Sequence, residues 1–567
     1  MSRVSLSAIG SLRGHVAGVG PLLATVLVHA TALGGGFVWL DHGDLEEGRA
    51  VLPLLSLGDA VTLRFGETGF YRPLVTLVHS LDAALYRDWA PGYHLTNLLL
   101  HLAVVATAPA FLHAYLGLTA SEGLLATLVF AVHPATWIVG GIAWRPELLA
   151  SLFTLLAVDA HLRARQEARP RRALAAAGAL ALALCSKETA LFWVPALVLA
   201  WEGARAATAG RAAGRDRSRS RAWVFGAEGL VLVLYLLARA QAVPEIWRVK
   251  PEALASSEAI GTRLRALGVL ALDLVRPGIP TLSDATPVVP ATNPSALAVG
   301  ALLAGAALAL LRIGRRSPSW LALVWLGVAL LPAANLVPLP RFRSPHYGYF
   351  AALPLAALSV LALRATTGKE ALVLRAGLVA FVTAGAVAGF LGGLRFRDDV
   401  HLFGPEVARD PAFREGHAEL GAHWLRVGRF DRAAFHLEQA RRATPGVIAY
   451  SDQASVLINL AGARLGQGQV DDADLLLQEA SAVPPSPSQA RLVAYNRGLI
   501  AARRGRDLEV VALLGPHRRG WSRPEPLLLL ARSLARTGRH EDARAVLAEA
   551  VPLLPEERRH EAEALVR

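Results

Sequence analysis

The chain has 567 residues, of which 53% are hydrophobic and 18% are charged, and its formal net charge is +13. The apolar residues come in runs of about 18–25, the length that crosses a bilayer, which excludes an ordinary soluble protein. The basic charge does not indicate nucleic-acid binding, because the arginines cluster between the apolar runs, as the positive-inside rule predicts for cytoplasmic loops. The single cysteine, Cys185, excludes internal disulfides and a multi-cysteine metal site.

The apolar runs predict an all-α protein in which residues 17–395 form a polytopic bundle of about eleven transmembrane spans. Residues 1–16 contain Arg3 and Arg13, so the N-terminus is predicted to be cytoplasmic and the first apolar run a span rather than a signal peptide. The predicted spans lie near residues 17–40, 93–117, 120–140, 146–162, 222–242, 295–312, 319–336, 347–364 and 371–391, and two short spans share residues 173–200.

Residues 173–200 are predicted to form a hairpin rather than one span. Arginine clusters flank the stretch at 163–172 and 205–221, and a single crossing cannot leave both clusters in the cytoplasm. A turn at Ser186-Lys187-Glu188 removes the conflict. It also keeps the two charged residues out of hydrocarbon, where a central Lys or Asp costs about 2.5–3.5 kcal/mol.

Two stretches are too polar to cross and are predicted to be helices that lie in the membrane interface. The first, residues 72–86, belongs to the first external loop at 41–91 and repeats apolar residues on one helical face. The second, residues 259–276, contains several charged residues. With both stretches left uncrossed, the arginine clusters that follow fall inside, and the C-terminal domain is predicted to be external.

Residues 411–567 are predicted to form an α-solenoid of tetratricopeptide repeats. Self-similarity appears at a period near 34 residues, the length of that repeat. The glycines predicted to turn between paired helices are Gly428, Gly468 and Gly538, and a third, degenerate unit is predicted around Gly498 and Gly505. Small residues at fixed offsets allow the two helices of each unit to approach closely.

Ionisable residues at the predicted span ends are the candidates for chemistry. Asp41 and Asp44 follow the first span, where they are either solvated caps or a general base at the membrane surface. Arg72, which follows Tyr71, either snorkels to the interface or holds a lipid phosphate with its planar fork. Lys187 in the hairpin turn is a natural partner for a phosphate, and a structural pair with Glu188 is the alternative.

Three further motifs lie near the predicted outer surface. His94 and Asn97 are one helical turn apart at the start of a span, which suits either hydrogen bonds inside the bundle or metal ligation. His133 precedes Pro134, and the proline accounts for a kink without any function. Arg145 follows at the next turn, after Trp144 and before Glu147. No cofactor is assigned, and a divalent metal remains an open possibility.

These motifs, in this order, resemble the bacterial relatives of membrane mannosyltransferases that carry tetratricopeptide repeats. That group belongs to the GT-C glycosyltransferases and is similar to the protein O-mannosyltransferases. The residues that carry the resemblance are Phe37-Val38-Trp39 with Asp41, Tyr71-Arg72-Pro73-Leu74, His94-Leu95-Thr96-Asn97, His133-Pro134, Trp144, Ser186-Lys187-Glu188, Asn335-Leu336-Val337-Pro338-Leu339 and Tyr347-Gly348-Tyr349.

The resemblance implies a polyprenyl-phosphate-linked sugar donor, often mannose, that is used at the external membrane face. By position, Asp41 becomes the base that activates an acceptor hydroxyl. Arg72 and Lys187 become phosphate contacts, and Tyr347 lines the donor site.

The chain departs from the family's pattern at three places. Leu40 replaces the first member of an acidic pair, and Trp137 stands where a glutamate is expected. Pro345-His346 replaces an Asp-Arg pair, although Arg341 and Arg343 are close by and join the donor-site candidates.

The first hypothesis is therefore a glycosyltransferase of the inner membrane that moves a sugar, with mannose favoured, from a polyprenyl phosphate to a protein or glycan hydroxyl. The rival is a non-catalytic, membrane-anchored repeat scaffold that binds a protein partner or a lipid-linked sugar. A protein partner of the repeats is expected under both hypotheses. Asp41 discriminates between them, because only the enzyme needs that carboxylate.

Overall fold

The computed structural model describes residues 6–46, 56–62, 65, 69–167, 169–206, 215–244, 256–336, 339, 341–482, 484–519, 521, 523–554 and 559. The chain divides into two compact units. The membrane unit comprises Met1–Val38 and Leu52–His401, and the C-terminal unit comprises Trp39–Val51 and Leu402–Arg567. The predicted first external loop is thus shared between the two units.

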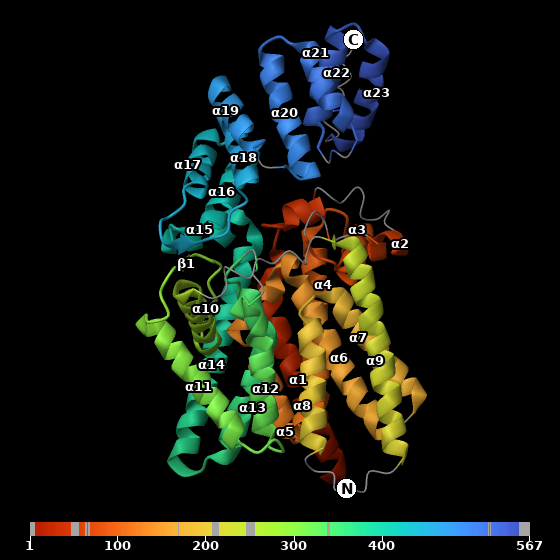
Figure 1. Cartoon of the computed structure of the whole chain (residues 1–567), viewed down its shortest axis with the longest axis vertical. Coiled ribbons are helices and arrows are strands. Elements are labelled where there is room, and N and C mark those ends of the chain that lie inside the picture. Colours follow the sequence, from red (N-terminus) through yellow and green to blue (C-terminus); the bar gives the residue numbers. More distant parts are fainter. Residues whose placement is uncertain are drawn as a thin grey trace, which may run out of the picture. The chain divides into compact units, whose positions relative to one another are not determined.

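The membrane unit is built from helices, most of which run in roughly one direction (Figure 1). Its α-helices are α1 (Leu6–His29), α2 (Leu57–Thr62), α3 (Pro73–Tyr86), α4 (Ala90–Leu116), α5 (Ala120–Ala131), α6 (Arg145–Glu167), α7 (Pro170–Ser186), α8 (Ala190–Ala206), α9 (Arg215–Ala242), α10 (Ser257–Val275), α11 (Pro294–Arg312), α12 (Pro318–Leu330), α13 (Tyr349–Ala365) and α14 (Gly368–Gly393). Short 3-10 segments are η1 (Ala30–Gly34), η4 (Pro134–Gly140), η5 (Ile142–Trp144), η8 (Leu331–Ala334), η9 (Pro345–Gly348) and η10 (Leu394–Arg397), and β1 is Thr286–Pro287.

Several of these helices can cross a membrane. Within the described residues, five helices are long and apolar enough to span, or six if a bent pair is counted as one span. Exposed leucines such as Leu302 and Leu311 on α11, at 70% and 85% exposure, suit contact with lipid tails rather than water. The chain is therefore a multi-pass membrane protein, and the count of eleven spans stays a prediction.

The apolar run at 120–140 does not form one straight helix. α5 ends at Ala131, and η4 continues at an angle of 61° to it. Pro134 begins η4; it has no backbone N–H to continue the helix, and its ring clashes with the preceding turn. The proline kink expected from the sequence is confirmed. It ends the helix predicted over residues 120–140 at Ala131.

The predicted break within 173–200 is also confirmed. α7 ends at Ser186 and α8 begins at Ala190, so Lys187 lies in the turn between two short helices. Its backbone is extended, with φ −161° and ψ 144°, which ends the helical hydrogen-bond ladder. The charged turn therefore has the local form that the double arginine flank predicted.

The two stretches predicted to lie in the interface form α3 and α10. Neither is among the membrane-spanning candidates found in the described residues. On α3, Val75, His79 and Asp82 form the buried face, whereas Leu81 and Leu85 are exposed by 58% and 63%. The apolar stripe thus faces outward, as a helix in the membrane interface requires.

The C-terminal unit consists mainly of paired helices. They are α16 (Arg414–Arg426) with α17 (Phe430–Arg441), α18 (Gln453–Gly466) with α19 (Val470–Ala480), α20 (Pro487–Arg503) with α21 (Asp507–Leu514), and α22 (Glu525–Arg536) with α23 (His540–Ala550). α15 (Asp399–Arg409) contains the boundary between the units, and the remaining elements are η2 (His42–Glu46), β2 (Val447–Ile448), η11 (Gly515–His517) and η12 (Val551–Leu553).

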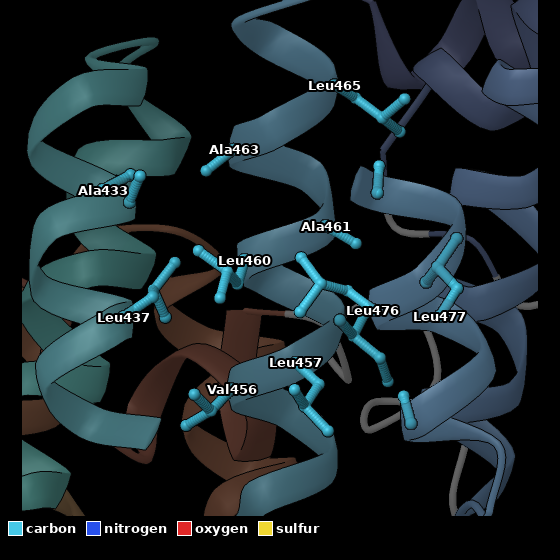
Figure 2. Close-up of a cluster of buried hydrophobic side chains, with 14 of the residues drawn as sticks. Ala433, Leu437, Val456, Leu457, Leu460, Ala461, Ala463, Leu465, Leu476 and Leu477 are labelled. Carbon is cyan, nitrogen blue, oxygen red and sulfur yellow. The ribbon is translucent and has the colours of Figure 1, made fainter. Parts of the chain in front are cut away.

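Glycine turns separate the helices of each pair where the sequence predicts them. Gly428, Gly468, Gly505 and Gly538 have φ between 70° and 81°, a conformation that glycine adopts without steric cost. Leu437 of α17, Leu460 of α18 and Leu477 of α19 are fully buried in one apolar cluster, and Figure 2 shows small alanines between the helices. The assignment of these pairs to the tetratricopeptide class stays a prediction.

Candidate functional site

Buried charged side chains gather around the α7–α8 turn of the membrane unit. The Lys187 ammonium forms an ion pair with the Glu147 carboxylate, and the two side chains are only 9% and 2% exposed. Glu188, the next residue of the same turn, pairs with Arg72, with 3.0 Å between Nη2 of the arginine and Oε2 of the glutamate. Residues from the start of α3, the start of α6 and the α7–α8 turn thus meet in one cluster of two cations and two carboxylates.

Arg72 is held in place from several sides. Its Nε also donates to Glu188 Oε2 at 3.1 Å, and the Tyr71 backbone N–H donates to the other carboxylate oxygen at 3.2 Å. The guanidinium carbon lies 4.0 Å from the centre of the Phe70 ring, a cation–π contact. The Tyr71 hydroxyl donates to the Val61 carbonyl at 2.7 Å. These contacts fix the orientation of the arginine fork.

The electrostatics of the turn follow from burial and from these pairs. Burial opposes the charged form of Lys187 and lowers the pKa of its ammonium. Burial is the largest single influence on Glu188 and raises its pKa, but the charge of Arg72, the hydrogen bonds to the carboxylate and the charge of Arg239 together outweigh it, so the pKa of that carboxyl lies below its usual value. Glu188 is therefore an ionised anchor for Arg72.

A second polar network surrounds the fully buried Arg145 at the start of α6. Its Nη2 pairs with Asp82 of α3 at 2.7 Å and donates to the Tyr93 carbonyl at 3.0 Å. Its Nε donates to Asn97 Oδ1 at 2.9 Å, and the Asn97 amide donates to the Gly141 carbonyl at 2.8 Å. Arg145 and Asn97 thus join α3, α4 and the η4–η5 segment, which is a structural use of both residues.

The candidate histidines also make hydrogen bonds within the bundle. His94 Nε2 lies 3.1 Å from the Gly36 carbonyl, and His133 Nε2 lies 2.9 Å from the Leu274 carbonyl. In the part of the chain that the structure describes, no group of three or more His, Cys, Asp or Glu side chains could hold a metal ion.

Arg343 and Tyr347 line a pocket beside α10. Arg343 donates to Thr286 Oγ1 at 3.1 Å and to the Ala285 carbonyl at 2.8 Å, and the Tyr347 hydroxyl donates to the Arg341 carbonyl at 3.3 Å. The pocket is lined by Ala266, Val269, Leu270, Asp273, Thr281, Ala333, Phe342, Arg343, Ser344, Pro345 and Tyr347. The Lys187 ammonium lies 5.9 Å from the centre of the Tyr347 ring. Tyr347 therefore lies between the pocket and the charged cluster.

Asp41 and Asp44 belong to the C-terminal unit. Asp41 is 1% exposed, and the backbone N–H of Asp44 donates to the Leu40 carbonyl at 2.9 Å. The expectation that Asp41 serves the same reaction as Arg72 and Lys187 stays a prediction.

Trp137 occupies the position where the resemblance implies a glutamate. Its indole is fully buried, donates to the Gly392 carbonyl at 2.9 Å and lies 5.0 Å from the Phe396 ring centre. The residue is a packing element of the η4 segment, with no acid–base group to offer.

Two carboxylates in these networks were not assigned to the site from the sequence. Glu147 lies 40 residues from Lys187 and Asp82 lies 63 residues from Arg145, so local spacing gives no sign of either pair. The sequence contains only weak indications that these two carboxylates belong to the networks. Glu147 is an acidic residue in the first turn of an apolar helix, and Asp82 is an acidic residue opposite the apolar stripe of α3.

Comparisons with known proteins give partial matches. No protein-family model matches the chain. A segment is 38% identical over 135 residues to "Protein O-mannosyl-transferase Tmtc2" of Drosophila melanogaster, covering 22% of this chain and 14% of that protein. Another segment is 33% identical over 171 residues to "Protein O-mannosyl-transferase Tmtc1" of the same organism, covering 28% of this chain and 20% of that protein. Mouse "Protein O-mannosyl-transferase TMTC2" is 41% identical over 99 residues, covering 16% and 11%.

The matched segments thus span a fifth or less of these curated relatives. Their names belong to the class that the sequence motifs resemble. Among solved structures, ArnT from Cupriavidus metallidurans, bound to undecaprenyl phosphate, gives a TM-score of 0.41 at 14% identity over 81% of this chain and 76% of that one. Arabinofuranosyltransferase AftD from mycobacteria gives a TM-score of 0.38 at 19% identity, over 67% of this chain and 27% of that one. Such TM-scores are too low to establish a shared fold.

Proposed function

We propose that this chain is a membrane glycosyltransferase of the GT-C type. It transfers a sugar, with mannose favoured, from a polyprenyl-phosphate donor to a protein or glycan hydroxyl at the external face of the inner membrane. The observation that supports this proposal best is the buried cluster of Arg72 and Lys187 beside Tyr347 and the pocket at α10. The partial matches to proteins named O-mannosyltransferases agree with it.

The cluster suits a phosphate because its cations are oriented before any ligand binds. Stability alone does not account for these buried ion pairs, because the desolvation of the charges offsets much of the attraction between them. An ammonium has three N–H donors, of which the pair with Glu147 uses one. The bond to Glu188 uses Nε and Nη2 of Arg72. Further donors of both cations serve to bind phosphate oxygens.

In the proposed reaction, the carboxylate of Asp41 accepts the proton of the acceptor hydroxyl. The hydroxyl oxygen forms a bond to the anomeric carbon of the sugar, while the bond between that carbon and the phosphate oxygen breaks and leaves its electron pair on the lipid phosphate. Arg72 and Lys187 stabilise the negative charge that develops on the leaving phosphate, because their positions are fixed in advance. General-base catalysis of this kind contributes about 10²–10⁴ in rate.

One observation favours a second candidate, the non-catalytic scaffold that binds a protein partner or a lipid-linked sugar. Trp137 is packed and hydrogen-bonded at a position where the resemblance implies a carboxylate. A protein with this substitution could retain lipid binding and lose transfer.

The deciding experiment uses the whole purified protein in detergent with polyprenyl-phosphate mannose and other polyprenyl-phosphate sugars. Co-purified lipid is identified by mass spectrometry, and release of free polyprenyl phosphate is followed in the presence of hydroxyl acceptors. Release that depends on the acceptor supports the enzyme. Bound lipid without any transfer supports the scaffold.

The proposed orientation is tested separately. Reporters fused after residue 400 and near residue 210 are expected to be active outside and inside the cytoplasm, respectively, because arginine clusters set the orientation of the spans. A cytoplasmic C-terminal unit would contradict use of the donor at the external face.

A further inference from the structure

The segment that carries Asp41 is anchored by residues of the C-terminal unit that lie far from it in the sequence. Trp39 is 7% exposed, and its indole Nε1–H donates to Glu415 Oε1 of α16 at 2.9 Å. The two residues are 376 positions apart in the chain. The Trp39 ring also makes an edge contact with Phe403 of α15, with 6.4 Å between ring centres. A buried aromatic side chain with its N–H satisfied fixes the segment two residues before Asp41.

A second contact fixes the residue that follows Asp41 in the chain. His42 Nε2 lies 2.9 Å from Nη2 of Arg426, at the end of α16. A guanidinium only donates hydrogen bonds, so His42 accepts through Nε2 and its proton is assigned to Nδ1. Asp41 therefore lies between two residues that are both held by α16.

The backbone at Trp39 is unusual in a way that needs such support. Its φ is 59°, in the left-handed region that residues other than glycine rarely occupy. Local hydrogen bonds follow at once, from the His42 N–H to the Trp39 carbonyl at 3.2 Å and from the Asp44 N–H to the Leu40 carbonyl at 2.9 Å. A strained conformation of this kind persists only where the surrounding structure determines it.

We propose that Glu415 and Arg426 of the C-terminal unit are positioning residues for Asp41. Neither acts on the substrate. Glu415 holds Trp39 and Arg426 holds His42, and together they set the place of the carboxylate between them. The role as a base rests on the proposed function, whereas the anchoring rests on the contacts themselves.

The anchoring is tested without any activity. Carboxyl footprinting with a water-soluble carbodiimide and glycine ethyl ester, read by tandem mass spectrometry, reports the accessibility of Asp41 in the whole protein. We expect Glu415→Leu and Arg426→Leu each to raise labelling of Asp41 at least threefold, while Glu415→Gln and Arg426→Lys leave it near the wild-type level. Glutamine keeps an acceptor for the indole, and lysine keeps a donor for His42.

Arg441→Leu is the matched control, because it removes an exposed ion pair with Glu479 in the same unit. Arg426 is itself exposed, so its substitution does not disturb a core. Unchanged labelling of Asp41 in both leucine variants would overturn the anchoring, whatever the activity of the protein.

The catalytic consequence is tested by steady-state kinetics. Where the wild type transfers sugar, Glu415→Leu and Arg426→Leu are expected to lower kcat at least tenfold and to change the donor KM less than twofold. Recovery in Glu415→Gln and Arg426→Lys supports positioning. An active wild type whose leucine variants keep kcat within twofold overturns the positioning role. A wild type that transfers nothing overturns the proposed function instead and leaves the footprinting result to decide the anchoring.

Discussion

The two units use charge in different ways. In the membrane unit, the ion pairs of Lys187 with Glu147 and of Arg145 with Asp82 are buried, with no side chain of the four more than 9% exposed. In the C-terminal unit the core is leucine and alanine, and pairs such as Arg504 with Asp471 lie at the surface, the latter carboxylate being 94% exposed. The difference sets the cost of breaking a pair: removing one partner leaves an uncompensated buried charge in the membrane unit, whereas surface pairs contribute little to stability.

The largest effect is expected at Asp41. Asp41→Asn keeps the size of the side chain and one hydrogen-bonding oxygen but removes the base, so transfer should fall by about 10²–10⁴. Binding of the donor lipid, measured by co-purification, should persist, because Arg72 and Lys187 are unchanged. Asp44→Asn is the comparison, three residues along the same segment. If the double variant transfers sugar at the wild-type rate, neither residue is the base.

The next largest effect concerns the buried pair in the membrane unit. Lys187→Met leaves the Glu147 carboxylate buried without its partner and should destabilise the protein by about 3–5 kcal/mol. Adding Glu147→Gln should restore most of that loss, because the uncompensated charge is gone. Arg504→Met in the C-terminal unit, a surface pair, should cost less than about 1 kcal/mol. Thermal unfolding in detergent measures all three. Equal losses from Lys187→Met and Arg504→Met would remove the contrast between the units.

A substitution in the apolar core of the C-terminal unit should lower the free energy of unfolding by a similar or smaller amount. Leu437→Ala opens a cavity at a fully buried position and should cost about 2–5 kcal/mol. Leu475→Ala, on a side chain that is 64% exposed, is the control and should be nearly neutral. Hydrogen exchange of the α17 and α18 peptides in the whole protein reports the loss. Protection unchanged by Leu437→Ala would show that this cluster is not the core of the unit.

The smallest effect is a pH dependence in the same unit. His436 Nδ1 lies 3.0 Å from His417 Nδ1, and burial, together with the nearby His417 and Arg432, lowers the pKa of His436 to about 4. The unfolded chain, with a histidine pKa near 6.5, binds the proton first, so stability is complete above about pH 6.5 and is lost as the pH falls toward 4. The side chain is half-buried, so the loss between pH 7 and pH 5 should be about 1 kcal/mol.

Exchange rates of the α16 and α17 peptides, corrected for intrinsic pH dependence, measure that loss. His436→Gln should flatten the profile, whereas Leu475→Ala, on a side chain that is 64% exposed, is the control and should leave it unchanged. A profile that stays equally steep in His436→Gln would assign the pH dependence to other groups.

Local features of the fold could be predicted from the sequence. The kink at Pro134, the break at Lys187 and the four glycine turns each follow from the chemistry of one or two residues. The end of α5 at Ala131 was missed, because hydropathy alone continues across the proline.

The partners within the candidate site could not be predicted in the same way. Glu147 and Asp82 meet their cations over separations of 40 and 63 residues, and only the packing of helices brings them together. The pairing of Trp39 with Glu415 is the extreme case, since no periodicity links a loop after the first span to a helix 376 residues further along the chain.

That separation has a consequence for synthesis. The ribosome makes Trp39 376 residues before Glu415, and at about 5–20 residues per second the delay is roughly 20–75 s. For that time the Asp41 segment exists without α16, while the helices of the membrane unit are inserted. The contacts of this segment with α16 therefore form only after Arg426 has been translated, and the order of synthesis places assembly of the Asp41 loop after synthesis of the membrane unit, which ends at His401.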